Sequence, residues 1–448
     1  MPVAERQAGR AVIIGAGLAG LAAGYRLSRD GWDVLVLERE SEVGGRCRTV
    51  TRGGFRFDTG AQYFRDSYDA ALKTAIEVGL GDRFRIPVGG AGVLARGRVV
   101  PFVPRSMNPF ALLPWSALGP ESAAGVLSLS IHLLRGYRSY NIRFPHRWTD
   151  GDRLTASDFI SSRTSSDFVR SLAGPLCRYA LGAEPEKVSA AAFMAALRAT
   201  FADRVGCFAG GIGLLPGSLA ERTQVICGME AQQVVLEGGR AVAVKARPAQ
   251  GGRARSYRAD FVVCAVPAPH VAAMTGGMAG AAGRVIGETV YSPEVVVNLG
   301  FPGEVGGVAG PVLLTAAGGF RAGWALTHRS KSLEHVPPGA AALTLVYSGR
   351  EAASLMGEED GAIIELALEE ARGVFDLACM SPVERRVDRH DPGRPVASPG
   401  HAARVRELWR AGSGIENLVL AGDWTRSPTM EGAVSSGFYA AESAVLRR

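Results

Sequence analysis

Three glycines near the start of the chain constrain its fold more than any other feature. They stand in Gly15-Ala-Gly17-Leu-Ala-Gly20, after the apolar run 11–14 and at the start of a stretch with helical spacing over 18–29. A glycine-rich turn between a buried strand and a helix lets backbone N–H groups approach a pyrophosphate at the helix N-terminus. The sequence therefore predicts a dinucleotide-binding βαβ unit. The residues predicted to meet the phosphates are Gly15, Gly17, Leu18, Ala19 and Gly20.

A carboxylate ends the second predicted strand of this unit. Residues 33–38 form another apolar run, which closes with Glu38. A carboxylate at this place can accept hydrogen bonds from both ribose hydroxyls of an adenosine. Glu38 is therefore the predicted ribose acceptor, with a solvated acid at a strand end as the alternative. A carboxylate at this place would also repel a 2′-phosphate on the ribose. The neighbouring Arg39, which is included in the predicted site, weakens that argument because it has a positive charge.

A second glycine pair favours FAD over NAD. The motif Gly44-Gly45-Arg46 follows the ribose acid closely, and Gly60-Ala61-Gln62 comes soon after it. Paired glycines allow a second backbone approach to a long cofactor, and Arg46 can neutralise phosphate charge. An NAD-binding domain does not need this additional loop.

The far end of the chain supplies a second acid and a helix start. An apolar run at 418–421 leads into Gly422, Asp423 and Trp424, and an acid after a buried strand can bind ribityl hydroxyls. The next motif opens a predicted helix over 431–446, whose N-terminus would stabilise negative charge on the pyrimidine edge of a reduced flavin. That motif consists of Met430, Glu431, Gly432, Ala433 and Val434.

Taken together, these motifs resemble the flavin amine oxidase superfamily, in particular its protoporphyrinogen oxidase and carotenoid–squalene desaturase branch. Residues 181–189 resemble a G-x-D-P-x-x-L-S stretch of protoporphyrinogen oxidases, and 210–215 resemble their G-G-M-x-x-L turn. The resemblance implies that Arg46 and Gly60-Ala61-Gln62 lie beside the flavin and that the backbone of Ala231 meets the adenine. It also implies Asp423 at the ribityl or phosphate end and residues 430–434 at the ring edge.

The departures from the amine oxidase pattern bear on the substrate. Amine oxidases of this group often have an aromatic residue just before Met-Glu-Gly-Ala, where this chain has Thr429. They also tend to have a lysine early in the strand that corresponds to 295–301, and none is present there. No cysteine precedes Met430, so we expect FAD to be bound non-covalently. The candidate pocket residues are Gln62, Tyr63, Trp424 and Thr429, and the sequence identifies no catalytic acid or base.

We therefore expect an FAD-dependent oxidoreductase that removes hydride from a C–C or C–N bond of a largely apolar, cyclic or polyene small molecule. Oxygen or another acceptor would reoxidise the flavin. Two alternatives remain open: a flavin amine or amino-acid oxidase, and a non-catalytic binding protein resembling Rab GDP-dissociation inhibitors. The intact flavin motifs argue against the second.

The order of the predicted elements indicates an α/β fold, with a Rossmann-like FAD-binding domain and a discontinuous second domain of mixed sheet and helices. The predicted FAD-binding domain comprises 1–105, 205–290 and 395–448. The predicted substrate-binding domain, with a helical cap, comprises 106–204 and 291–394. Within it, His328 and His335 are expected at the surface or in the core rather than in a pocket.

Charge and cysteine usage narrow the partners and the location. The formal charge is +7, but the basic residues are scattered, which argues against nucleic acid. Six cysteines without metal-ligand or redox spacing indicate reduced thiols, a cytoplasmic location and no metal site. The apolar segment 106–134 is interrupted by prolines and is expected to be a helical cap, with peripheral membrane contact as the alternative.

Overall fold

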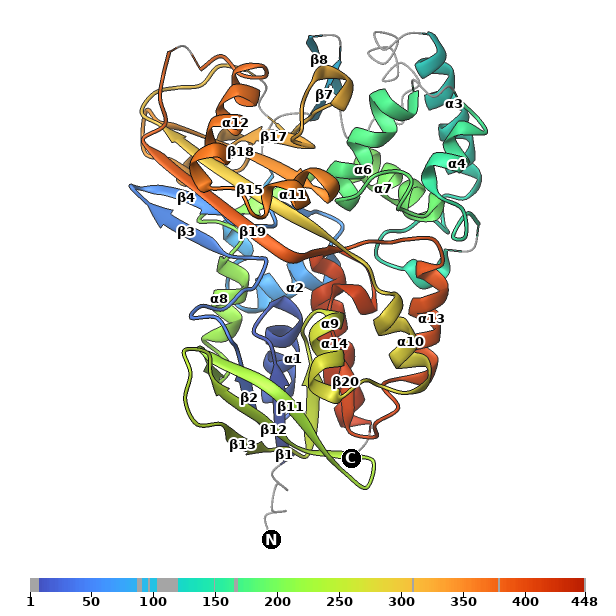
Figure 1. Cartoon of the computed structure of the whole chain (residues 1–448), viewed down its shortest axis with the longest axis vertical. Helices are drawn as coiled ribbons and strands as arrows, with labels where there is room; N and C mark the ends of the chain where they lie inside the picture. The colour runs from blue at the N-terminus through green and yellow to red at the C-terminus, as the bar shows by residue number, and fades with distance from the viewer. Residues whose placement is uncertain are drawn as a thin grey trace.

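The computed structural model describes residues 8–86, 91–95, 97–102, 120–148, 150–164, 168–307, 310–377 and 379–446. These residues form two main layers (Figure 1), with a parallel sheet in the lower half and a larger mixed sheet above it.

A parallel sheet of five strands forms the first layer, in the order β10-β2-β1-β14-β20. Its strands are buried apolar runs, as expected where both faces of a parallel sheet are covered. The strands are β1 (Ala8–Ile14), β2 (Trp32–Leu37), β10 (Val225–Ile226), β14 (Phe261–Cys264) and β20 (Leu418–Leu420).

The two faces of this sheet are covered differently. Helices α1 (Leu18–Arg29), α8 (Leu214–Ala220) and α14 (Met430–Val445) pack on the face that includes Ala11 and Ile13. The opposite face, with Val12 and Ile14, packs on an antiparallel layer. That layer consists of β11 (Met229–Glu237), β12 (Arg240–Pro248) and β13 (Arg255–Arg258).

The second layer is a seven-stranded mixed sheet in the order β19-β15-β18-β17-β16-β7-β8. Helices α11 (Gly349–Leu355) and α12 (Asp360–Arg372) pack on one of its faces. The strands are β7 (Ala91–Ala95), β8 (Arg98–Phe102), β15 (Tyr291–Phe301), β16 (Val312–Leu313), β17 (Trp324–Thr327), β18 (Ala341–Ser348) and β19 (Glu384–Pro395).

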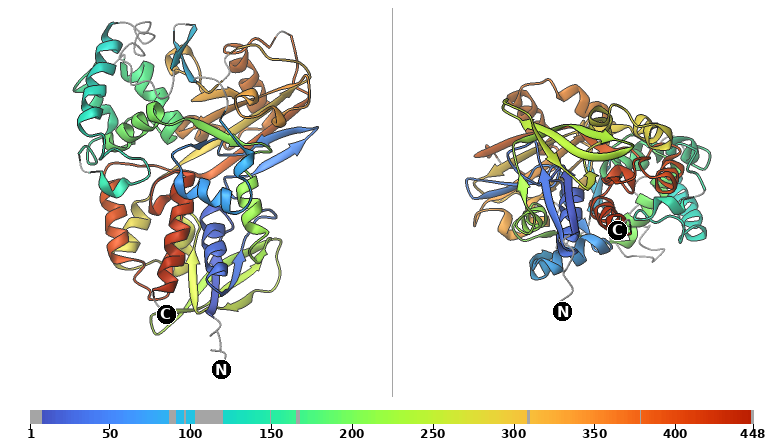
Figure 2. Two further views of the ribbon diagram at one scale, coloured as in Figure 1. Left: turned by 180° about the vertical axis from the view of Figure 1, so that it is seen from behind. Right: turned by 90° about the horizontal axis from the view of Figure 1, so that it is seen from below.

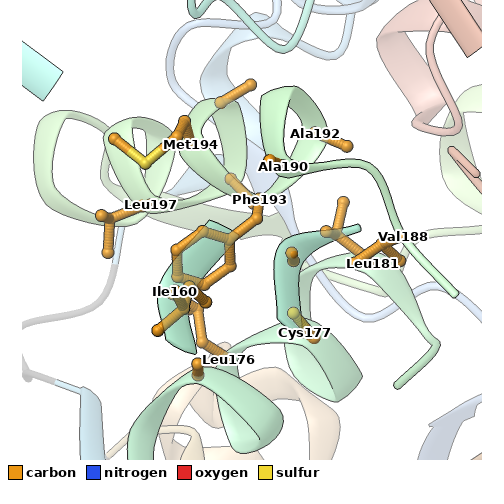
Figure 3. Close-up of a cluster of buried hydrophobic side chains, with 14 of the residues drawn as sticks. Ile160, Leu176, Cys177, Leu181, Val188, Ala190, Ala192, Phe193, Met194 and Leu197 are labelled. Carbon is orange, nitrogen blue, oxygen red and sulfur yellow. The ribbon is translucent and has the colours of Figure 1, made fainter. Parts of the chain in front are cut away.

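A group of helices lies beside the large sheet (Figure 2). Its centre is α7 (Ala190–Ala202), which begins where Ser189 Oγ accepts a hydrogen bond from the Ala192 amide at 3.1 Å. Phe193 of α7 packs against Ile160 and Leu176 (Figure 3). The other helices of the group are α3 (Pro120–Arg135), α4 (Ala156–Ser161) and α6 (Gly174–Leu181).

The architecture confirms the predicted fold class, an α/β protein with a dinucleotide-binding sheet and a second mixed sheet. The division into two domains stays a prediction. The predicted FAD-binding domain includes residues 91–102. In the structure, β7 and β8 of this range belong to the seven-stranded sheet instead. None of the helices in the described ranges combines the length and the apolar composition that crossing a membrane requires.

Candidate active site

A pocket of about 730 Å³ runs from the carboxyl ends of β1 and β2 to the seven-stranded sheet. Most of the residues predicted from the motifs line it. They are Gly15, Gly17, Leu18, Ala19, Glu38, Arg39, Gly44, Gly45, Arg46, Gly60, Ala61, Gln62, Tyr63, Ala231, Gly422, Asp423, Trp424, Thr429, Met430 and Ala433.

The turn between β1 and α1 is open to the pocket. Helix α1 begins after Gly17 without a side-chain cap, so the amides of its first turn have no side-chain acceptor. A Cβ built on Gly17 would meet nothing within 4 Å, and Gly15 has a φ of +96°. The turn therefore offers bare N–H groups and space for a phosphate, as the motif predicted.

Gly20 has a different role, because it does not line the pocket. A Cβ at this position would lie 1.9 Å from the carbonyl oxygen of Gly15. The missing side chain lets α1 pack closely on its own turn.

Backbone amides hold the Glu38 carboxylate at the next part of the pocket. Glu38 is 8% exposed, and its two carboxylate oxygens accept hydrogen bonds from the amides of Ala16, at 2.7 Å, and Glu40, at 3.0 Å. Each oxygen keeps a second lone pair. The side chain of Arg39 pairs with Glu40 at 3.0 Å rather than with Glu38. Among the described residues, Glu38 forms no ion pair.

An ion pair crosses the middle of the pocket. Arg46 Nη2 lies 3.0 Å from Asp423 Oδ1, and Nη1 donates to the carbonyl of Gly393. Burial alone would lower the pKa of Arg46, but the Asp423 carboxylate raises it above its ordinary value. Arg46 is therefore a fixed cation next to the acid that the sequence predicted for the ribityl or phosphate end.

The C-terminal motif divides between the pocket and the protein interior. Thr429 Oγ1 accepts from the Gly432 amide at 3.0 Å and so caps α14, and both Thr429 and Met430 line the pocket. Glu431 does not, because its carboxylate accepts hydrogen bonds from the amides of Ala70 and Ala71 in helix α2 (Asp69–Glu77). Gly432 and Val434 also lie outside the pocket lining.

A buried lysine, which the sequence analysis missed, fixes the loop at residues 58–63. Lys331 Nζ lies 2.8 Å from Asp58 Oδ2 with both side chains fully buried, and it also donates to Gln62 Oε1. Burial would raise the pKa of Asp58, but Lys331 and the hydrogen bonds of the carboxylate lower it. The lysine lies outside 295–301, where one was sought. The chain has only four lysines among many arginines, but the sequence around Lys331 is polar and charged, so no local signal identifies it as buried.

Three neutral side chains surround this ion pair. His328 Nε2 lies 2.8 Å from Thr344 Oγ1, and His335 Nε2 lies 3.3 Å from the carbonyl oxygen of Phe208. Burial lowers the pKa of both imidazoles and raises that of the Cys207 thiol. The histidines thus lie in the core, one of the two expected places.

Asp58, Cys207 and His335 could between them offer ligand atoms to a metal ion, because these atoms lie within 4.8 Å of one another. The Lys331 ammonium already supplies positive charge to the Asp58 carboxylate, and the Cys207 thiol is held in its neutral form. This chemistry favours an ion pair at this place over a bound cation.

An aromatic and apolar wall closes the end of the pocket at the seven-stranded sheet. Tyr63, Tyr179 and Trp324 pack with Val346, and the rings of Tyr179 and Trp324 meet edge-on at 5.2 Å. Trp424 lies elsewhere, since it packs in the core beside β14 and β20 and its indole donates to the Val266 carbonyl at 3.1 Å. Tyr179 and Trp324 were not predicted, because no local motif surrounds them.

The fold and the pocket define a dinucleotide-binding oxidoreductase of the flavoprotein type, and comparison with known proteins identifies its family. The family described as "Flavin containing amine oxidoreductase" matches residues 18–445, so the chain belongs to it. The chain is therefore a flavin-dependent oxidoreductase, and the predicted superfamily is confirmed.

Relatives of known sequence support this assignment, and solved structures show the same fold. Coproporphyrinogen III oxidase of Mycobacterium tuberculosis (strain H37Rv) is 28% identical over 441 residues, which cover 92% of each chain. Phytoene desaturase of Rhodobacter capsulatus is 56% identical over a stretch of 52 residues. Among solved structures, a putative protoporphyrinogen oxidase from Exiguobacterium sp. 255-15 has a TM-score of 0.76 at 18% identity, covering 98% of this chain and 99% of that one. Cyclohexylamine oxidase from Brevibacterium oxydans has a TM-score of 0.73, also at 18% identity and the same coverage, and shares the fold.

Proposed function

We propose that the chain binds FAD non-covalently and removes hydride from a C–C or C–N bond of a largely apolar, cyclic or polyene small molecule. The observation that carries the proposal is the continuity of the pocket. Bare helix amides and Glu38 lie at one end, Arg46 and Asp423 in the middle, and the aromatic wall at the other end. Relatives that oxidise porphyrinogens or desaturate carotenoids, according to their names, support a substrate of this kind.

The fit to FAD rests on the donors and acceptors along the pocket. The first-turn amides of α1, together with the open space at Gly17, suit the pyrophosphate. The free lone pairs of Glu38 suit the adenosine ribose, beside the strand that includes Ala231. Arg46 and Asp423 suit the phosphate and ribityl groups.

Non-covalent binding is supported by the residues nearest to the predicted ring site. Thr429, which precedes Met430, has no nucleophilic thiol, and its hydroxyl caps α14. Burial raises the pKa of the Cys47 thiol, which also lines the pocket, to about 12, so it is not a thiolate at neutral pH. Precipitation of the protein with acid should therefore release all of the flavin into the supernatant.

The residues of the pocket orient the substrate and exclude water. When bound, the flavin accepts the hydride, and oxygen or another acceptor takes the electrons. Tyr63, Tyr179 and Trp324 provide flat apolar surfaces for a ring or polyene. The Tyr63 hydroxyl lies 2.6 Å from Ser330 Oγ, which itself donates to the Thr327 carbonyl, so the tyrosine hydroxyl donates to the serine. Tyr63 is therefore fixed as a surface rather than poised as a base.

Amine oxidation is the alternative that the fold allows. Aromatic faces on both sides of an amine would favour it, but Trp424 packs in the core and Thr429 has no ring. We expect primary amines and amino acids to reduce the flavin slowly or not at all. Anaerobic stopped-flow, with a panel of amines set against porphyrinogens and polyenes, tests this choice. Rapid bleaching by a common amine would overturn it.

Peripheral membrane contact through residues 106–134 stays a second proposal, and residues 106–119 lie outside the described residues. In α3, Leu127, Ile131 and Leu134 are exposed at helical spacing, with Arg135 beside them. An apolar stripe next to a cation supports contact with an anionic lipid surface. Flotation with anionic liposomes tests it, and a protein that stays entirely in the bottom fraction contradicts it.

A further inference from the structure

One buried cation in the pocket has no carboxylate partner among the described residues. Arg65 ends strand β5 (Phe64–Arg65), which pairs with β9 (Val205–Phe208). It lines the pocket and is 8% exposed. Its guanidinium makes a single hydrogen bond to the described residues, from Nη1 to the Ala199 carbonyl at 2.9 Å. Buried charges in proteins are almost always paired with an opposite charge. Arg65 is an exception among the described residues, because its only side-chain partner is a neutral carbonyl oxygen.

The charged groups around Arg65 already have other partners. Asp203 is an acid within electrostatic range of Arg65, and it accepts a hydrogen bond from Ser67 Oγ at 2.8 Å. Burial raises the pKa of Asp203, and the Arg65 charge lowers it only in part. The neighbouring cation Arg394 is matched, since it pairs with Glu294 at 2.9 Å. The two arginines on this side of the pocket thus differ in that only Arg394 has a carboxylate partner.

Two further polar hydrogens lie at the same end of the pocket. The Tyr179 hydroxyl has no hydrogen-bond partner among the described residues, and although burial raises its pKa, the Arg65 charge acts to lower it. The Trp324 Nε1 atom is buried and has no acceptor in the part of the chain that the structure describes. Tyr179 is within electrostatic range of Arg65, and its ring contacts that of Trp324 at 5.2 Å. We call Arg65, Tyr179 and Trp324 the donor row.

We propose that the donor row binds a carboxylate group of the substrate, with Arg65 as its counter-charge. The inference rests on the proposed function and adds an acidic substituent to the apolar ring or polyene. A guanidinium matches the two oxygens of a carboxylate, and the phenol and the indole add neutral donors. One positive charge balances one carboxylate, whereas a phosphate dianion would remain half compensated. Val205, which pairs with Arg65, and Val346, which packs with Tyr179 and Trp324, also line the pocket and suit the hydrocarbon part.

A matched pair of probes tests the charge without depending on turnover. The holoenzyme is titrated with 2-naphthoate and with 2-naphthamide, which share the ring and nearly the same shape but differ in charge. Binding is followed by the shift that a nearby aromatic ring causes in the visible absorption of the flavin. Hydrogen bonds to charged groups contribute about 1.5–3 kcal/mol, so the wild type should bind the carboxylate about 10- to 100-fold more tightly.

Substitutions assign that preference to Arg65. Arg65→Met should abolish the difference between the two probes, and Arg65→Lys should retain part of it, because the charge stays but the fork geometry is lost. Arg204→Met is the matched control. Arg204 is an arginine of the same region that pairs with Asp66 at the surface and lies outside the pocket lining, and its loss should leave the preference unchanged.

The outcomes separate this inference from the proposed function. Equal binding of the two probes by the wild type overturns the carboxylate site even if Arg65→Met does not fold. The carboxylate site is also overturned if Arg65→Met still prefers 2-naphthoate over 2-naphthamide. The same holds if the substitution changes the flavin spectrum but not this preference, since Arg65 would then act elsewhere. The proposed function fails independently, when porphyrinogens and polyenes do not reduce the flavin in an enzyme that still prefers 2-naphthoate.

Discussion

The two ends of the pocket are built in different ways. At the adenosine end, the residues come from compact motifs: the turn at 15–20, Glu38, and the loop at 44–46. At the substrate end, Arg65, Tyr179 and Trp324 come from three elements that are far apart along the chain. The first end presents mainly backbone amides, whereas the second presents mainly side chains.

This difference follows from what each end must recognise. A pyrophosphate is the same in every FAD, and backbone amides can meet it only where glycines bring the chain close. A substrate varies, and side chains presented by a rigid sheet can vary with it. The adenosine end should therefore be sensitive to single local changes, while the substrate end should depend on the packing that brings its elements together.

Glu38→Arg should have the largest effect on FAD binding. The variant loses both ribose acceptors and places a cation there, so FAD should bind at least about 100-fold more weakly while the fold persists. The ratio of flavin to protein absorbance and a titration of the apoprotein measure this. Glu42→Arg, an exposed change outside the pocket lining, should keep its FAD. If the Glu38→Arg variant purifies with a full complement of FAD, Glu38 is not the ribose acceptor.

Lys331→Met should destabilise the whole protein rather than one motif. It leaves the Asp58 carboxylate buried without its counter-charge, which typically costs about 3–5 kcal/mol of unfolding free energy. Urea denaturation measures it. The double variant Lys331→Met/Asp58→Asn should recover part of the loss, because it removes the orphaned charge. A loss below about 1 kcal/mol in the single variant would show that loop 58–63 does not depend on the ion pair.

The same contrast explains what the sequence could predict. The strands and helices around the adenosine end have strong local signals, and helix α1 was predicted at 18–29, where it lies. Strand β19 was not predicted, since its sequence Glu-Arg-Arg-Val-Asp-Arg-His-Asp-Pro-Gly-Arg-Pro is charged and includes Pro392. It lies at the edge of the seven-stranded sheet, where solvent accepts the charges and a proline removes no bond from a neighbouring strand.

The candidate site divides in the same way. Glycine spacing predicts the phosphate side, because that chemistry requires glycines at fixed positions. Lys331 and Trp324 acquire their roles only when separate strands pack against loop 58–63, and no pattern near them in the sequence records that contact. Trp424 was a predicted pocket residue and does line the pocket, but its indole is directed at the Val266 carbonyl.

Acid should destabilise the protein through the two histidines buried beside the Lys331–Asp58 ion pair. Burial lowers the pKa of His328 and His335, so the folded protein resists protonation of these imidazoles, while the unfolded chain takes up protons near pH 6.5. Stability is therefore complete above about pH 6.5 and falls as the pH is lowered below it. Urea denaturation between pH 7.5 and 5 should show this slope, and His328→Asn should reduce it. An unchanged slope in that variant would assign the acid sensitivity to other groups.

Tyr63→Phe should have the smallest effect and should leave FAD binding unchanged. The variant keeps the ring in the aromatic wall and removes only the hydroxyl that donates to Ser330 Oγ at 2.6 Å. A hydrogen bond of this kind contributes about 1 kcal/mol, so the free energy of unfolding should fall by about that amount. Because the ring surface persists, the affinity for apolar substrates should change by only a few-fold. If flavin reduction stops in this variant, the hydroxyl has a chemical role, and the substrate end is more than a shaped surface.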